Sequence, residues 1–299
     1  MSAATAAARA GEAVREPAPS AARGQSSTAA KVLLYVALVV FAVMYIYPFL
    51  IQLVTSVKTA PDAAANPLSL SPNPFTWAAF ERLADTDFPL WFINSTWVAV
   101  LATLARILFN SMAGYALARI SFRGRGGLFT AILAVMAVPG VVLLIPKFLV
   151  LNQVGMYNSA SALVVPLAAD AAGVFIMKQF FESIPVSVEE AARIDGAGTF
   201  RIFWSVVLPM ARPALLTLTI LAFQGTWNEL PHFIVASQDP DLYTLTKGVA
   251  TLTSGQLGAG FQFPITMAAA LIMTIPVALL FFVFQRYFVR GATEGAVKG

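Results

Sequence analysis

Six long apolar runs constrain the fold of this chain more than any other feature. They cover Val32–Val54, Phe92–Ala118, Leu128–Val150, Ala160–Phe181, Pro213–Ala236 and Pro264–Phe288. A helix of about 20 apolar residues spans the ~30 Å hydrocarbon layer of a bilayer. The composition agrees, because 58% of the residues are hydrophobic and only 11% are charged, against about 25% charged in soluble domains. The sequence therefore predicts an all-α, polytopic membrane protein with six transmembrane helices.

Proline and glycine interrupt several of these runs, for example at Pro139, Pro166 and Pro276. Membrane helices tolerate such breaks, because neighbouring helices and waters satisfy the freed backbone groups. We therefore expect a bundle of kinked helices over residues 32–290. Residues 1–31 are rich in Ala, Ser, Gly and Arg and lack an apolar core, so they predict a disordered N-terminal tail. Residues 291–299 are predicted to form a C-terminal tail.

The basic residues predict the orientation of the chain. With the N-terminus inside, 14 of the 19 Lys and Arg residues fall on the cytoplasmic side, four fall outside and Arg106 lies within a span. Cytoplasmic loops of membrane proteins carry such an excess of Lys and Arg. Both termini are thus predicted to be cytoplasmic, and so is the segment between the fourth and fifth spans. The net charge of +4 is explained by topology and does not indicate a nucleic-acid partner.

The cytoplasmic segment 185–212 reads as two short helices joined by a glycine turn. Ser187 and Glu190 form a capping-box pattern, and the helix that they open should run to about Asp195. Gly196 then supplies a left-handed residue that ends it. The stretch Phe200–Leu208 has apolar residues at helical spacing, which predicts an amphipathic helix along the membrane. The residues alone leave two interpretations open, an interfacial connector and a docking element for a cytoplasmic protein.

The same segment resembles the EAA signature of permeases in ABC importers. The matching positions are Glu190, Ala191, Ala192, Gly196, Leu208 and Pro209, with Val206 where the family usually has Ile. Three other stretches resemble the carbohydrate subfamily, in particular the smaller membrane subunit of the maltose importer. They are FIMKQFFESIP before the motif, Trp227-Asn228-Glu229 in the fifth span, and the terminal GAVKG. The resemblance covers about residues 30–299.

This resemblance implies a set of partners and a mechanism. A second permease subunit, two cytoplasmic ATPase subunits and an extracellular sugar-binding protein would complete the importer in a bacterial cell membrane. The chain itself would bind no cofactor, since ATP and Mg²⁺ would be held by the ATPase subunits. The resemblance implies ATPase-coupling roles for Glu190, Ala191, Ala192, Asp195, Gly196, Leu208 and Pro209. It also implies that the terminal Gly295, Lys298 and Gly299 reach the ATPase subunits.

Polar residues within the spans are the candidates for the substrate pathway. Ionisable groups in lipid are costly and often functional, so we expect Arg106 and Asp170 to pair inside the bundle. The candidate pathway residues are Asp170, Gln224, Trp227, Asn228 and Glu229. Amide and aromatic groups suit sugar hydroxyls and apolar sugar faces. Hydrogen bonding between helices, which polar side chains commonly provide in membranes, is the alternative interpretation for them.

Several functions are excluded or disfavoured by residues that the sequence lacks. The chain has no cysteine and a single histidine, His232, which leaves no group for thiol catalysis or a Cys-based metal site. It has no G-x-x-x-x-G-K-[ST] motif, so it does not bind ATP through a P-loop. The alternative transport function is a proton-coupled carrier that uses Asp170 or Glu229. A requirement for a co-expressed ATPase separates the two functions.

Overall fold

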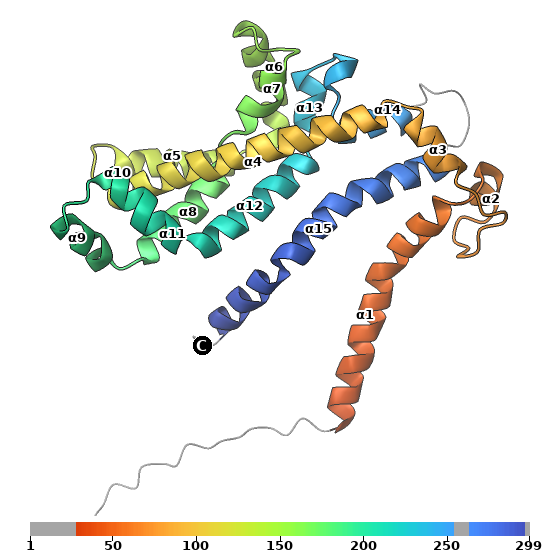
Figure 1. The fold of residues 1–299 in the computed structure, drawn as a ribbon, viewed down its shortest axis with the longest axis horizontal. Helices are drawn as coiled ribbons and strands as arrows, with labels where there is room; N and C mark the ends of the chain where they lie inside the picture. The colour runs from red at the N-terminus through yellow and green to blue at the C-terminus, as the bar shows by residue number, and fades with distance from the viewer. Residues whose placement is uncertain (1–27, 254–262, 297–299) are drawn as a thin grey trace, which may run out of the picture. The chain divides into compact units, whose positions relative to one another are not determined.

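The structure is a computed structural model that describes residues 28–253 and 263–296, and every regular element in these ranges is a helix (Figure 1). The chain divides into two units, residues 1–49 and residues 50–299, and each is described by itself. Helix α1 covers Thr28–Thr55, with Pro48 inside it, and contains the first predicted span. The predicted disordered tail thus gives way to helix at Thr28, and its first 27 residues lie outside the described part of the chain.

The second unit begins on the predicted outer side with two short helices, α2 (Ala60–Ala65) and α3 (Ala78–Ala84). The next helix, α4 (Phe88–Arg119), contains the second predicted span and extends it at both ends. It packs against α8 (Ala171–Ser183) and α12 (Arg212–Trp227), so the helices of three predicted spans lie side by side (Figure 1). Helix α4 is therefore the element around which the unit is organised.

The third predicted span is not one kinked helix. It consists of α5 (Arg125–Met136), the 3-10 turn η2 (Gly140–Leu143) and α6 (Leu144–Gln153). The helices on the two sides of the break are bent by 101°. Pro139 lies at this break, where it lacks a backbone donor and restricts the residue before it. The sequence predicted a kinked helix here, and the bend is larger than a kink.

The fourth predicted span contains an irregular turn but is still long and apolar enough to cross a membrane as one helix, Ala160–Ser183, whereas the fifth is shorter than predicted. The fourth is α7 (Ala160–Val164), η3 (Val165–Leu167) and α8, with Asp170 as the N-cap of α8. The fifth stops at the end of α12 and is followed by α13 (Pro231–Ala236). A single helix to residue 236, as predicted, is wrong because Pro231 disfavours helical backbone in the residue before it.

The outer elements that follow are η5 (Pro240–Leu242) and α14 (Leu245–Thr253), and the sixth span is α15 (Phe263–Ala296). Helix α15 contains Pro276 and continues beyond Phe288, where the sixth apolar run ends. Four helices of the described residues are long and apolar enough to cross a membrane, or up to six spans if each of two bent pairs counts as one. An all-α, polytopic architecture is confirmed.

Candidate functional site

The segment 185–212 folds into a helix, a turn and a second, irregular helix, as predicted in outline. The first helix, α9, covers Val186–Ile194 and ends at the C-cap Asp195. Gly196 follows with a φ of 80°, and its amide donates to the carbonyl of Arg193 while the amide of Ala197 donates to Ala192. This pair of bonds is a Schellman motif. The predicted end of the helix at Gly196 is therefore confirmed.

The predicted capping box at Ser187 and Glu190 is wrong. The N-cap of α9 is Pro185, and no side chain caps the helix. Ser187 therefore lies within the first turn, where its amide is one of the donors that an N-cap side chain would satisfy. Proline at the helix entrance already fixes the backbone, so the helix begins two residues earlier than the Ser-x-x-Glu pattern suggests.

The second helix of the segment departs from regular α geometry. It consists of α10 (Thr199–Ile202), a π-helix, η4 (Phe203–Val207), and α11 (Leu208–Met210). The π-helix shifts the buried face, so that Ile202, Phe203 and Val207 are buried. Phe200 is 69% exposed and Trp204 39% exposed, although the predicted apolar stripe included both. The amphipathic helix exists, and the exposure of these two aromatic side chains is compatible with a face that lies along the membrane, which stays a prediction.

The predicted coupling residues divide into an exposed set and a packed set. Glu190, Ala191, Asp195 and Gly196 are exposed on one short helix and its turn. Ala192 and Leu208 form the packed set, and both are half-buried. They lie against an apolar cluster that includes Tyr115, Phe181, Ile202, Phe203 and Val207. Pro209 is exposed in the first turn of α11. The segment thus presents an exposed helix end while its other side is fixed to the bundle.

A buried carboxylate that the sequence analysis did not single out holds α9 to the bundle. Glu189 is 1% exposed. Its Oε1 lies 2.9 Å from Nε of Arg119, and its Oε2 accepts a hydrogen bond of 3.0 Å from the hydroxyl of Tyr115. The sequence signal was an acid one residue before the EAA stretch and an arginine at the predicted cytoplasmic end of the second span.

The expected pairing of Arg106 and Asp170 is confirmed. Arg106 Nε lies 3.4 Å from Asp170 Oδ2 and donates a 2.7 Å hydrogen bond to the carbonyl of Leu167. Asp170 also caps α8, because its Oδ1 accepts from the amide of Gly173 at 2.7 Å. Asn110 completes the cluster through two 3.2 Å bonds, Nδ2 to Asp170 Oδ2 and the Asp170 amide to Asn110 Oδ1. The cluster joins α4 to the break in the fourth span.

The other pathway candidates lie at the end of α12. Gln224 and Asn228 are exposed one turn apart. Trp227 is only 2% exposed, and its indole N–H donates to the carbonyl of Met273 at 3.0 Å. Glu229 is half-buried and its Oε1 accepts from the amide of His232 at 2.8 Å. The two amides are therefore exposed on this chain taken by itself, whereas Trp227 packs within the bundle.

The predicted tail contacts are only partly within the structure. Gly295 belongs to the backbone of α15, and Lys298 and Gly299 lie outside the described residues. The helix reaches past the point at which the tail was predicted to begin.

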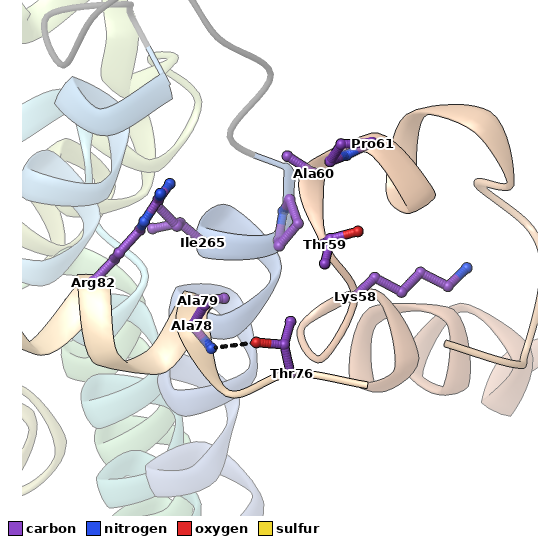
Figure 2. A pocket seen from close by; sticks show the side chains of 10 residues that line it. Lys58, Thr59, Ala60, Pro61, Thr76, Ala78, Ala79, Arg82 and Ile265 are labelled. Atoms are coloured by element: carbon purple, nitrogen blue, oxygen red, sulfur yellow. Dashed lines mark hydrogen bonds between the residues drawn. The ribbon is translucent and has the colours of Figure 1, made fainter. Parts of the chain in front are cut away.

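On the predicted outer side, a pocket of about 250 Å³ lies between the start of α2, α3 and the start of α15 (Figure 2). Thr59, Thr76, Arg82 and Ile265 are among the residues that line it. The ammonium of Lys58 points away from it (Figure 2) and donates 2.7 Å bonds to the carbonyls of two loop residues, Asn66 and Ser69. Of the two basic residues that line the pocket, Lys58 therefore does not direct its charge into it.

Residues 107–294 match the family described as the inner membrane component of binding-protein-dependent transport systems. The chain belongs to this family. The match begins within α4 and includes the whole of the segment 185–212 and of helix α8, which carries Asp170 at its N-cap.

Curated relatives align with nearly the whole permease. The sulfoquinovosyl glycerol transport system permease protein SmoH of Agrobacterium fabrum is 34% identical, with 90% of this chain and 94% of that protein covered. The diacetylchitobiose uptake system permease protein NgcG of Streptomyces coelicolor is 33% identical, with 87% of each covered. The arabinooligosaccharides transport system permease protein AraQ of Halalkalibacterium halodurans is 31% identical, with 89% and 96% covered.

A solved structure has the same fold as the permease. It is a chain from the crystal structure of a bacterial ABC transporter involved in the import of the acidic polysaccharide alginate. The two chains superpose with a TM-score of 0.75 at 25% identity, with 88% of this chain and 98% of that chain covered. The predicted family and the predicted fold class are both confirmed.

Proposed function

We propose that this permease is one of two membrane subunits of an ATP-driven, binding-protein-dependent sugar importer, and that it forms half of the translocation pathway. The observation that carries the proposal is the exposed end of α9, with Glu190 on its surface, in a chain of this family. Relatives named for arabinooligosaccharides, diacetylchitobiose and sulfoquinovosyl glycerol support a carbohydrate or glycoside as the substrate class.

The importer would contain four kinds of chain. A second, different permease completes the pathway, two cytoplasmic ATPase subunits supply energy, and an extracellular sugar-binding protein delivers the substrate. ATP and Mg²⁺ belong to the ATPase subunits, and this chain binds no cofactor. The excess of Lys and Arg in the segments assigned to the inside supports a bacterial inner-membrane protein with both termini in the cytoplasm.

The proposed mechanism uses α9 as the coupling helix. Closure of the ATPase dimer around ATP draws α9 with it, and the helices behind it change from an inward-facing to an outward-facing arrangement as rigid bodies. The exposed carboxylate of Glu190 is suited to a basic residue of the ATPase. The exposed Ala191 adds little bulk, so an ATPase surface can approach the helix closely. The terminal Gly295–Gly299 would add a second contact with the ATPase subunits.

The alternative, a proton-coupled carrier without an ATPase, is less well supported by the geometry. Asp170 is bound by Arg106, Asn110 and the start of α8. These contacts fix the carboxylate at the junction of α4 and α8, which favours a structural role over that of a proton carrier. Glu229 is engaged by the amide of His232.

The test is a charge reversal on the exposed face of α9. Glu190→Lys should reduce the amount of ATPase that co-purifies with the permease by at least about tenfold, because one charge pair of an interface is replaced by repulsion. Membrane insertion should be unchanged. The matched control is Glu81→Lys, the same reversal at an exposed site on α3. Wild-type uptake without any ATPase, or wild-type ATPase recovery with Glu190→Lys, would contradict the proposal.

A further inference from the structure

Helix α9 has one buried side chain, and that side chain is charged. Glu189 is 1% exposed, whereas Val186, Glu190, Ala191 and Ile194 on the same helix are all exposed. Burial of a carboxylate is strongly unfavourable unless it is paired and hydrogen-bonded. A helix that needed only to rest on the bundle would bury an apolar residue here, so the buried acid requires an explanation in its partners.

The partners of Glu189 come mainly from the cytoplasmic end of α4. Arg119 Nε lies 2.9 Å from Oε1, with side-chain exposures of 10% and 2% for the arginine and the glutamate. The hydroxyl of Tyr115 donates to Oε2 at 3.0 Å. Arg193, on α9 itself, approaches Oε2 at 3.7 Å but is half exposed. Exclusion of water strengthens the two contacts with α4 relative to the exposed one.

Arg119 makes further contacts that extend the connection to a third helix. Its Nη2 donates to the carbonyl of Phe181 at 2.6 Å and also to the carbonyl of Ile184. These carbonyls belong to the C-terminal end of α8, where helices leave acceptors without partners. The guanidinium therefore joins the ends of α4 and α8 to the carboxylate of α9 at one point.

We propose that Glu189 is a positioning residue that transmits movement of α9 to the cytoplasmic ends of α4 and α8. This inference rests on the proposed function, in which the ATPase moves α9. The two adjacent acids then have different tasks, since Glu190 faces the ATPase and Glu189 faces the bundle. An apolar contact allows sliding, whereas a short buried ion pair with Arg119 and a directional hydrogen bond from Tyr115 restrict it, so the ends of α4 and α8 follow α9.

The experiment measures whether ATP changes the bundle when Glu189 is altered. The chain has no cysteine, so Gln224→Cys on α12 introduces a single thiol that a maleimide can label. The rate of labelling is measured on this chain within the purified importer. MgATP is expected to change the labelling rate. Adding Glu189→Gln, which keeps the size of the side chain and removes its charge, should reduce that ATP-dependent change by about tenfold. The ATPase should still co-purify in the normal amount.

The matched control is Glu182→Gln, placed on the same reporter. Glu182 is also a paired carboxylate at the cytoplasmic end of α8, where it lies 2.7 Å from Lys178 Nζ and 3.7 Å from Arg125 Nη2. None of its ion pairs among the described residues involves α9. The ATP response of this control should stay within about twofold of the unmutated reporter. The roughly tenfold reduction expected for Glu189→Gln is large enough to be distinguished from a change of that size.

Each outcome bears on the inference. A full ATP response with Glu189→Gln would overturn it. A reduced response would also overturn it if the amount of ATPase in the complex fell in the same proportion. If Glu189→Gln does not accumulate, Tyr115→Phe decides, because it removes one donor and keeps the ring. It should reduce the response by about fivefold, and an unchanged response would overturn the inference. Absence of any ATP response in the unmutated reporter would instead contradict the proposed function.

Discussion

Gly173 lies where α8 meets α4, and an added methyl group has no room there. A Cβ at this position would lie 2.0 Å from Asn110 Nδ2, 2.9 Å from Asn110 Cγ and 2.9 Å from Leu218 Cδ1. Non-bonded heavy atoms prefer separations of about 3.5–4.0 Å. Asn110 cannot move freely, because it is fully buried and makes two hydrogen bonds with Asp170. Gly173→Ala should therefore displace Asn110 and open the Asp170 cluster.

The magnitude follows from three contributions. Overpacking of a close contact costs about 1–3 kcal/mol. Loss of the bonds between Asn110 and Asp170 adds about 1–2 kcal/mol. Alanine is a better helix former than glycine, and this difference stabilises the folded state by about 1 kcal/mol. We expect Gly173→Ala to lower the free energy of unfolding by about 1–4 kcal/mol, and the unfolding temperature by about 2–8 °C.

Thermal unfolding of the permease in detergent, followed by tryptophan fluorescence, measures this shift. Gly126→Ala is the matched control, because Gly126 also lies in the first turn of a helix and a Cβ added to it would meet no atom within 4 Å. Asn110→Ala provides a second check, since Gly173→Ala should cost much less in a chain that lacks the clashing amide. An equal cost in both backgrounds, or no shift at all, would refute the steric explanation.

Three further predictions concern the outer side of the permease. Gly248→Ala should destabilise the unit by about 1–3 kcal/mol, since the new Cβ would lie 2.0 Å from the indole of Trp91; thermal unfolding measures it. Asp62 accepts from the amide of Asn73 at 2.9 Å, a bond that lowers its pKa. A lowered folded-state pKa contributes stability above the unfolded value and loses it as the pH falls through the folded value. The protection of the Asn73 amide, measured as its exchange rate relative to the intrinsic rate at the same pH, should therefore fall as the pH drops below about 4, and should not do so in Asp62→Asn. Asn158→Gly keeps the positive φ of 62° but removes a side-chain oxygen that accepts from the backbone of residues 238 and 239. The expected loss is about 1–3 kcal/mol, and an unchanged unfolding temperature would contradict it.

The sequence predicted the elements of this fold better than their interruptions. Apolar run length identified every long helix, because the thickness of the bilayer sets that length. The pairing of Arg106 with Asp170 was also predictable, since charges within a bilayer need partners. The 101° bend near Pro139 was not, because neighbouring helices decide how far a proline break opens.

The candidate site shows the same limit at the level of single residues. Glu189 and Glu190 are adjacent acids, and nothing local says which of them is buried. That choice depends on Arg119 and Tyr115, which are distant in sequence and meet α9 only in the folded chain. The Gly196 turn was predictable because the requirement for positive φ is local.

The π-helix Phe203–Val207 sets the rotation of the helix in which it lies, within the segment 185–212. One residue of a helix corresponds to about 100° of rotation, and a single-residue deletion that restored α-helical geometry would turn α11 by that angle relative to α10. The chain bends by 80° between α11 and α12, so such a turn would change the direction in which α12 leaves the segment. The number of residues between Gly196 and α12 therefore acts as a rotational setting, and relatives of this permease should vary the side chains of the segment far more readily than its length.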